Sequence, residues 1–156
     1  MTENKPWHQQ VVIPALLRHA RNTYGVAMRQ ALADAGYDDI PANGLYVLGG
    51  LAMGAGDAPL GELIRELRIS KQAAGQLVET LVTRGYLKRD VDESDRRKLT
   101  VTLTERGQAA AATQAGAREL IDAELIARVG QADVDIARRT LAALIDIGKL
   151  TTGAKA

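Results

Sequence analysis

The chain has 156 residues, of which 46% are hydrophobic and 25% are charged, and its formal net charge is +1. This length suits one globular domain, and a net charge near zero argues against indiscriminate binding of polyanions. The absence of cysteine excludes a disulfide framework, a cysteine-ligated zinc site and a thiol redox sensor. We find no signal peptide and no apolar run of the roughly 18 residues that a membrane span needs. We therefore expect a cytoplasmic protein without membrane contact.

A long amphipathic helix is predicted over residues 11–35, because apolar residues recur there at steps of three and four. Pro14 lies near its start, where a missing N–H costs little. Gly36 is expected to end the helix. This helix would carry one apolar stripe along its length.

A second helix is predicted from about Pro41 to Met53, since proline suits the first helical turn. Residues 54–59 then form a loop. The glycine-rich stretch Gly49-Gly50 and Gly54-Ala55-Gly56 lacks the Gly-Lys-Ser/Thr of a phosphate-binding loop and follows no predicted strand. We interpret this stretch as a loose helix end rather than a nucleotide site.

The middle of the chain carries the most informative pattern. Residues 60–67 and 70–84 are two helix-period segments joined by a turn that permits only a sharp bend. Two alternating apolar segments, residues 86–91 and 99–103, follow with a charged turn between them, which is typical of a β-hairpin. Helix, turn, helix and basic hairpin together predict a winged helix-turn-helix.

Two more helices are predicted after the hairpin, over residues 104–129 and 132–147, with Gly130 between them. Their apolar stripes exceed what a compact winged unit needs, which suggests a partner helix from a second chain. The alternative is that these helices pack only on their own domain. That packing would leave the apolar stripes of two long helices with little else in the chain to cover them.

Over residues 60–107 the sequence resembles the MarR (multiple antibiotic resistance regulator) family of transcription factors. The resemblance rests on Leu63, Leu67, Ile69-Ser70, Leu77-Val78, Leu81, Arg84-Gly85-Tyr86-Leu87, Asp95-Arg96-Arg97 and Leu103-Thr104-Glu105-Arg106-Gly107. It implies a mainly α (α+β) fold in a single MarR-type domain, residues 1–156. Within it, residues 36–107 would be the winged helix-turn-helix, and residues 9–35 and 108–148 the dimerisation helices.

Three positions depart from the pattern of that family. Arg68 stands in the bend where the family usually has glycine, so a residue with a side chain would be forced toward a left-handed conformation, at roughly 1 kcal/mol. Glu93 replaces a common proline in the wing. Ile40 replaces a frequent capping Ser or Thr, so the usual signal for the start of the second helix is missing.

The helix that begins near Ser70 is the candidate for base readout. Ser70 can cap the helix, and the amides of the first turn can then face a phosphate. At 100° per residue, Gln72, Gly75 and Gln76 point outward, with Lys71 at the margin. Glutamine can bond adenine bidentately and lysine can donate to guanine, so Lys71, Gln72 and Gln76 are the candidate base-reading residues. The alternative is a solvated helix face with ordinary surface glutamines.

The wing tip carries four candidate DNA contacts, Asp95, Arg96, Arg97 and Lys98. Asp95 and Arg97 lie two apart, so both can point to one side of the hairpin and the carboxylate can orient the guanidinium. An oriented arginine on a narrow tip suits a DNA minor groove. The resemblance gives that role to Arg97, and Arg96 and Lys98 are better placed for phosphates. A solvated charged turn is the alternative.

The function expected from the resemblance is sequence-specific binding of a pseudo-palindromic double-stranded DNA operator by a homodimeric, ligand-responsive repressor. The residues that could line a pocket for a small-molecule effector are Trp7, Arg18, His19, Tyr24 and Tyr46, with core packing as the alternative role. No metal site, cofactor or enzyme active site is expected, because nucleophile–base motifs and paired histidine ligands are missing. The alternative function is a winged-helix module that binds protein rather than specific DNA.

Overall fold

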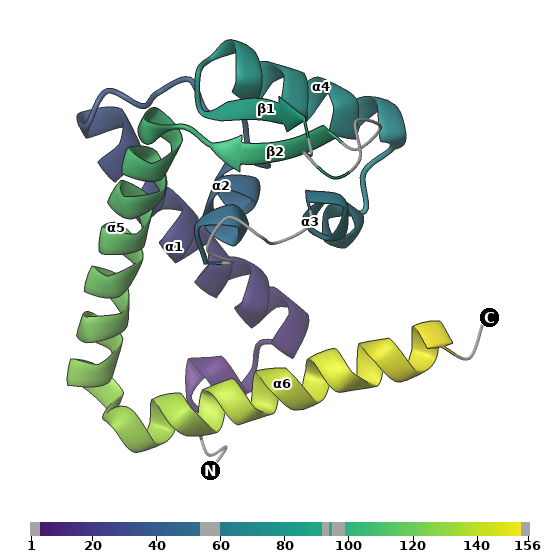
Figure 1. Ribbon diagram of the computed structural model, residues 1–156. Coiled ribbons are helices and arrows are strands. Elements are labelled where there is room, and N and C mark those ends of the chain that lie inside the picture. Colours follow the sequence, from purple (N-terminus) through teal and green to yellow (C-terminus); the bar gives the residue numbers. More distant parts are fainter. Residues whose placement is uncertain (1–3, 54–59, 92–93, 95–98, 154–156) are drawn as a thin grey trace. The chain divides into compact units, whose positions relative to one another are not determined.

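The computed structural model describes residues 4–53, 60–91, 94 and 99–153 (Figure 1). In chain order the elements are a short 3-10 helix Trp7–Gln9, α1 Ile13–Asp34, α2 Gly44–Met53, α3 Leu60–Leu67, α4 Lys71–Thr83, β1 Leu87–Val91, β2 Leu99–Leu103, α5 Glu105–Val129 and α6 Gln131–Gly153. The chain divides into two compact units, residues 1–118 and 119–156, each of which is described by itself. Among the described residues, no helix is long and apolar enough to cross a membrane.

The first unit contains a winged helix-turn-helix. The short turn between α3 and α4 is followed by β1 and β2, which pair antiparallel with Leu87 opposite Leu103 and Val91 opposite Leu99 (Figure 1). The predicted mainly helical fold with one two-stranded hairpin is therefore confirmed.

The core of this unit is built around α2. Four of its apolar side chains are buried together with the inward side of α4 and the start of β1 (Leu45, Val47, Leu48, Leu51, Leu77, Leu81, Tyr86 and Leu87). Ala110 of α5, Leu32 of α1 and Ile40 complete the cluster. Burial of this apolar surface holds α4 and the hairpin in place, because hydrophobic burial is the dominant favourable term in folding.

Two helices end on a glycine with the same geometry. Gly36 follows α1 with a φ of 86°, and the amide of Tyr37 donates to the carbonyl of Leu32 at 2.7 Å. Gly85 follows α4 with a φ of 82°, and the amide of Tyr86 donates to the carbonyl of Leu81 at 2.9 Å. Both are Schellman motifs, which satisfy carbonyls at a helix end. The predicted helix end at Gly36 is confirmed.

Helix α2 begins later than the sequence predicted. Pro41 lies outside it, in a turn that the amide of Gly44 closes by donating to the Pro41 carbonyl at 2.8 Å. Ile40 is buried in the core, and a Cβ at position 44 would lie 2.7 Å from its Cγ2. The turn therefore packs Ile40 inward and lets the helix begin on a glycine.

The interpretation of the glycine-rich stretch as a loose helix end is wrong for Gly49 and Gly50, and Gly54-Ala55-Gly56 lies outside the described residues. Both lie within α2, where a Cβ at position 50 would come 2.5 Å from Cδ2 of Leu63. A Cβ at position 49 would come 2.7 Å from Nε2 of Gln114. The two glycines thus let α3 and α5 approach the backbone of α2 closely.

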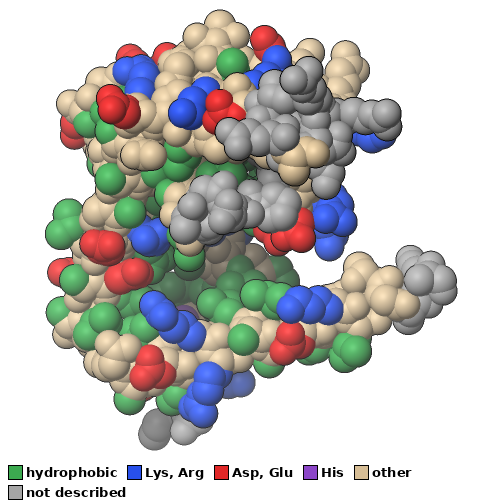
Figure 2. All heavy atoms as spheres, viewed as in Figure 1, with side chains coloured by type: hydrophobic (Ala, Val, Ile, Leu, Met, Phe, Trp, Pro, Cys, Tyr) green, Lys and Arg blue, Asp and Glu red, His purple; other side chains and the backbone are tan. Residues whose placement is uncertain are grey.

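The second unit exposes many apolar side chains. Helix α6 continues six residues beyond its predicted end at Ile147, to Gly153, and the hydroxyl of Thr151 donates to the Ile147 carbonyl at 3.2 Å. Hydrophobic side chains are visible on the surface of α6 (Figure 2). The exposed ones in this unit are Leu120, Leu125, Ile126, Val129, Ile136, Leu141, Leu144, Ile145, Ile147 and Leu150.

The start of α5 is packed tightly against the residue that precedes the wing. The amide of Thr104 donates to the carbonyl of Tyr86 at 3.1 Å, and the Thr104 hydroxyl donates to the Gly85 carbonyl. The same hydroxyl accepts the amide of Gly107 at 3.0 Å. Gly107 is buried, and a Cβ at this position would overlap the Tyr86 carbonyl oxygen. We call this contact between residues 85–86 and 104–107 the wing root.

We predict that Gly107→Ala destabilises the protein by about 1–3 kcal/mol, because the added methyl must push the Tyr86 backbone away. Gly116→Ala in the same helix is the matched control, since no atom lies within 4 Å of a Cβ there. That control should be neutral or up to about 1 kcal/mol more stable. Urea unfolding of the two variants measures both effects, and equal stability of the two would contradict the packing argument.

Candidate nucleic-acid interface

Helix α4 begins with the cap that the sequence predicted. Ser70 has an extended backbone, and its Oγ accepts a hydrogen bond from the amide of Ala73 at 3.1 Å. Such a cap satisfies one of the amides left unpaired in the first turn. It fixes the start of the helix next to Lys71, at the end where phosphate binding is favoured.

The bend before this cap carries the backbone strain expected at Arg68. Its φ is 52°, the only positive value at a non-glycine position among the described residues. An L-residue in this left-handed region costs roughly 1–2 kcal/mol. The turn between α3 and α4 is therefore made without the usual glycine, and the Arg68 side chain is exposed beside it.

The outward face of α4 is polar and open. Gln72, Gly75, Gln76 and Glu79 are exposed, whereas Ala74, Leu77, Val78 and Leu81 are buried. No atom lies within 4 Å of a Cβ built at Gly75, so another molecule can approach the backbone there. The helical face predicted from the sequence is confirmed, and with it the exposure of Lys71, Gln72 and Gln76.

An ion pair that the sequence analysis missed joins this face to the wing. Nη2 of Arg89 in β1 lies 2.6 Å from Oε2 of Glu79 in α4. The alternation of β1 places Leu87 and Arg89 on one side of the strand. Because Leu87 is buried in the core, the two-residue step from Leu87 to Arg89 was the sequence signal that could have placed Arg89 on the same side of β1.

The wing strands are tied together by Asp90. The Thr100 hydroxyl donates to the Asp90 carbonyl at 3.0 Å, and the Thr102 hydroxyl donates to Oδ2 of Asp90 at 3.1 Å. These bonds cross the hairpin, the first of them one residue pair from the tip end of the paired strands. The four candidate residues of the tip, Asp95, Arg96, Arg97 and Lys98, and the substituted Glu93 lie outside the described residues.

A polar network anchors the wing root to the loop between α1 and α2. The buried Tyr86 donates its hydroxyl to Oδ1 of Asp39 and accepts from Nη2 of Arg106 at 3.0 Å. The Arg106 guanidinium also lies 4.7 Å from the Tyr86 ring centre and 5.2 Å from that of Tyr37. Cation–π contacts and charged hydrogen bonds reinforce each other in such a cluster.

The network changes the ionisation of two of its members. Burial, followed by the hydrogen bond to Asp39, raises the pKa of Tyr86 to about 12. The hydrogen bond from Tyr86 lowers the pKa of the Asp39 carboxyl below its usual value, with a further contribution from Arg106. At neutral pH the network therefore holds a neutral phenol, a carboxylate and a guanidinium.

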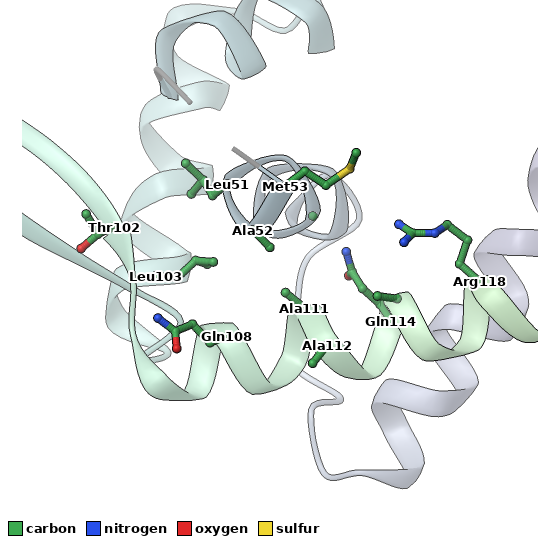
Figure 3. Close-up of a pocket in the computed structure, with 12 residues that line it drawn as sticks. Leu51, Ala52, Met53, Thr102, Leu103, Gln108, Ala111, Ala112, Gln114 and Arg118 are labelled. Atoms are coloured by element: carbon green, nitrogen blue, oxygen red, sulfur yellow. The ribbon is translucent and has the colours of Figure 1, made fainter. Parts of the chain in front are cut away.

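The first unit also contains a pocket of about 470 Å³ between α2, β2 and α5 (Figure 3). Gln114 lies in its wall, only 4% exposed, and donates from Nε2 to the carbonyl of Leu45 at 3.0 Å. Its Oε1 is buried without a hydrogen-bond partner. Arg118 extends from the next turn of α5 toward Met53 (Figure 3). An apolar pocket with an unpaired acceptor and a cation can hold a small molecule that carries a donor and a negative charge.

The five residues named as effector contacts lie elsewhere. Trp7 and His19 line a separate hollow with Val11 and Leu16, and Arg18 shares a shallow surface depression with His19. The Tyr46 hydroxyl donates to Glu66 of α3, and this bond raises the pKa of Tyr46. Tyr24 is half-buried on α1. The structure thus groups Trp7, Arg18 and His19 on one segment and separates Tyr46 from them.

The sequence of the winged unit identifies its family. Residues 38–98 match the model of the MarR family. The resemblance of the winged unit to the MarR family is thus confirmed. Proteins of this family are DNA-binding transcription regulators rather than enzymes, which confirms both expectations drawn from the sequence. Among the described residues, no cluster of His, Asp or Glu could hold a metal ion.

Solved structures of similar fold span nearly the whole chain. Streptococcus pneumoniae FabT in complex with DNA matches with a TM-score of 0.74 at 18% identity, covering 91% of this chain and 97% of FabT. The DNA complex of Staphylococcus aureus MepR matches at 0.69 and 16%, covering 87% and 98%. NadR in complex with 4-hydroxyphenylacetate matches at 0.68 and 19%, covering 92% and 96%. No curated protein matches the sequence. At these identities the likeness establishes a shared fold.

The raised pKa of Tyr86 predicts a pH-dependent contribution to stability. Ionisation is harder in the folded state, so this contribution is complete below the unfolded pKa of about 10 and is lost as the pH rises toward 12. We expect Tyr86→Phe to cost about 1 kcal/mol at neutral pH through the lost hydrogen bond. The difference between wild type and variant should then shrink above about pH 10.

Urea unfolding of both proteins at a series of pH values measures this difference. Tyr37→Phe is the matched control, because that ring also packs on Arg106. A Tyr86→Phe deficit that stayed constant from about pH 8 to 11 would show that the phenol does not titrate as described.

Proposed function

We propose that the protein is a cytoplasmic, ligand-responsive repressor that binds a pseudo-palindromic operator as a homodimer. The observation that carries this proposal is the exposed polar face of α4, with its capped start at Ser70 and the open backbone at Gly75. A helix of this kind fits the major groove of B-DNA, which is wide enough to admit it. FabT and MepR, which share the fold, were crystallised with DNA.

The two DNA-binding elements have different roles in this proposal. Lys71, Gln72 and Gln76 read base edges in the major groove, and the first amides of α4 beside Ser70 face a phosphate. At the wing tip Arg97, oriented by Asp95, enters the minor groove. Arg96 and Lys98 bind phosphates, which give affinity without sequence preference.

The homodimer is supported by the exposed apolar side chains of the second unit. Leu144 and Leu141 are almost half-exposed and Leu150 is 76% exposed, although each is a residue type that proteins usually bury. Contiguous apolar surface of this kind marks an interaction site. A second copy of the chain supplies an equivalent surface, and a two-fold dimer presents two recognition helices to two half-sites.

Substitutions should separate base readout from electrostatic affinity. Gln72→Ala or Gln76→Ala removes a base contact, so discrimination at one operator position should fall by about 1–3 kcal/mol while the salt dependence stays unchanged. Arg97→Ala should weaken binding to all sequences and reduce the salt slope by about one unit per wing. Gln30→Ala, an exposed glutamine on α1, is the matched control and should change neither.

The measurement is a binding titration over a salt series with a duplex selected by the wild-type protein from a random pool. Operator variants changed one base pair at a time give the discrimination, and sedimentation of the complex should give two chains per duplex. Loss of major-groove preference in Arg97→Ala would reverse the assigned roles. Failure of the wild type to select any sequence would favour the protein-interaction module instead.

The pocket between α2, β2 and α5 is the effector site we propose. In the wall of this pocket, Oε1 of Gln114 lacks a hydrogen-bond partner, so a ligand with a hydrogen-bond donor should bind there. Arg118 favours a ligand that is an anion. The structurally similar NadR and MepR bind 4-hydroxyphenylacetate and ethidium bromide. A ligand bound in this pocket contacts both β2 and α2, so it can shift the wing relative to α2. The hollow near Trp7 and His19 is the second location, and Tyr24 and Tyr46 are expected to affect the response indirectly.

A screen of small phenols, aromatic acids and cationic dyes for DNA release tests this site. Gln114→Met, which keeps the side-chain volume but removes both polar atoms, should abolish the response to the strongest compound and leave operator affinity within about threefold. Trp7→Ala is the control at the second hollow. A response lost in Trp7→Ala and kept in Gln114→Met would move the effector to that hollow.

A further inference from the structure

Glu79 places a carboxylate on the face of α4 that carries Gln72 and Gln76. It follows Gln76 by three residues and Gln72 by seven, spacings that keep all three side chains on one side of a helix. Its side chain is 60% exposed. A free carboxylate here would repel the phosphates of any duplex that this face approaches.

Arg89 meets this carboxylate from the wing. The pair joins Nη2 of Arg89 to Oε2 of Glu79 at 2.6 Å, and the Arg89 side chain is 45% exposed. Exposed ion pairs contribute little to folding stability. The effect of this pair should therefore appear when a highly charged ligand approaches the face on which it lies.

We propose that Arg89 is a positioning residue for DNA recognition, which holds and neutralises Glu79 so that the base-reading face of α4 can approach the duplex. The inference rests on the proposed binding of DNA by α4. The pair adds no net charge to this face, since its two members cancel. It also links α4 to β1, so that the recognition helix and the wing meet the duplex as one body.

This arrangement predicts opposite effects for its two members. Arg89→Gln uncovers the carboxylate and should weaken operator binding about fivefold per recognition helix at low salt. Glu79→Gln frees the guanidinium for a phosphate, so it should strengthen binding by a similar factor and steepen the salt slope by about one unit per recognition helix. The double variant Glu79→Gln/Arg89→Gln should return to the wild-type affinity and slope within about twofold.

The experiment measures Kd for these four proteins over a salt series, with the duplex selected by the wild type and with a non-specific duplex. Arg89→Lys keeps the charge and should retain most of the affinity. Arg128→Gln is the matched control, because Arg128 forms an exposed pair with Glu124 on α5 at 2.9 Å, and we expect no change in affinity or slope. Thermal unfolding midpoints should agree among all the variants.

Two results would overturn the inference while leaving DNA binding intact. A double variant as weak as Arg89→Gln would show that Arg89 contacts a phosphate itself. A Glu79→Gln protein that loses discrimination at a single base pair would show that Glu79 reads a base, as a carboxylate can at cytosine N4. Absence of any operator binding by the wild type would instead overturn the proposed function, and this inference with it.

Discussion

The close contact between Gly107 and the Tyr86 carbonyl is the constraint on which the geometry of the winged unit depends. Tyr86 ends the turn after α4 and precedes β1, whereas Gly107 lies in the first turn of α5. Both ends of the hairpin are therefore fixed at one point. The Thr104 hydroxyl adds to this contact by bonding to the Gly85 carbonyl and the Gly107 amide. A side chain at position 107 would separate the wing from the helix that carries it.

Polar interactions extend this anchor to the loop between α1 and α2. The Tyr86 hydroxyl is satisfied by Asp39 and Arg106, so burying it costs little. The Arg84 side chain also bonds to the Asp39 carbonyl. Because Tyr86 packs in the same cluster as Leu81 of α4, the wing root and the recognition helix share one core. Their separation is set by packing, which resists deformation more than a surface ion pair does.

The sequence predicted those features that depend on local signals. The end at Gly36, the cap at Ser70 and the strained turn at Arg68 follow from the conformational preferences of single residues. The errors lay where distant segments decide. Gly49 and Gly50 by themselves suggest a loose helix end, yet they lie within α2, where Gln114 and Leu63 occupy the space that side chains would fill. Nothing in residues 41–53 alone indicates those neighbours.

In the candidate site, too, some features follow from local sequence and others depend on distant segments. The outward position of Gln72 and Gln76 follows from the helical repeat, which needs no knowledge of the rest of the chain. The pairing of Glu79 with Arg89 requires β1 to lie beside α4, and this depends on the turn at Gly85 and the burial of Leu87. A charge on a recognition helix therefore cannot be assigned an effect from its own position. In the proposed complex, its partner on the next element decides whether DNA meets a carboxylate or a neutral pair.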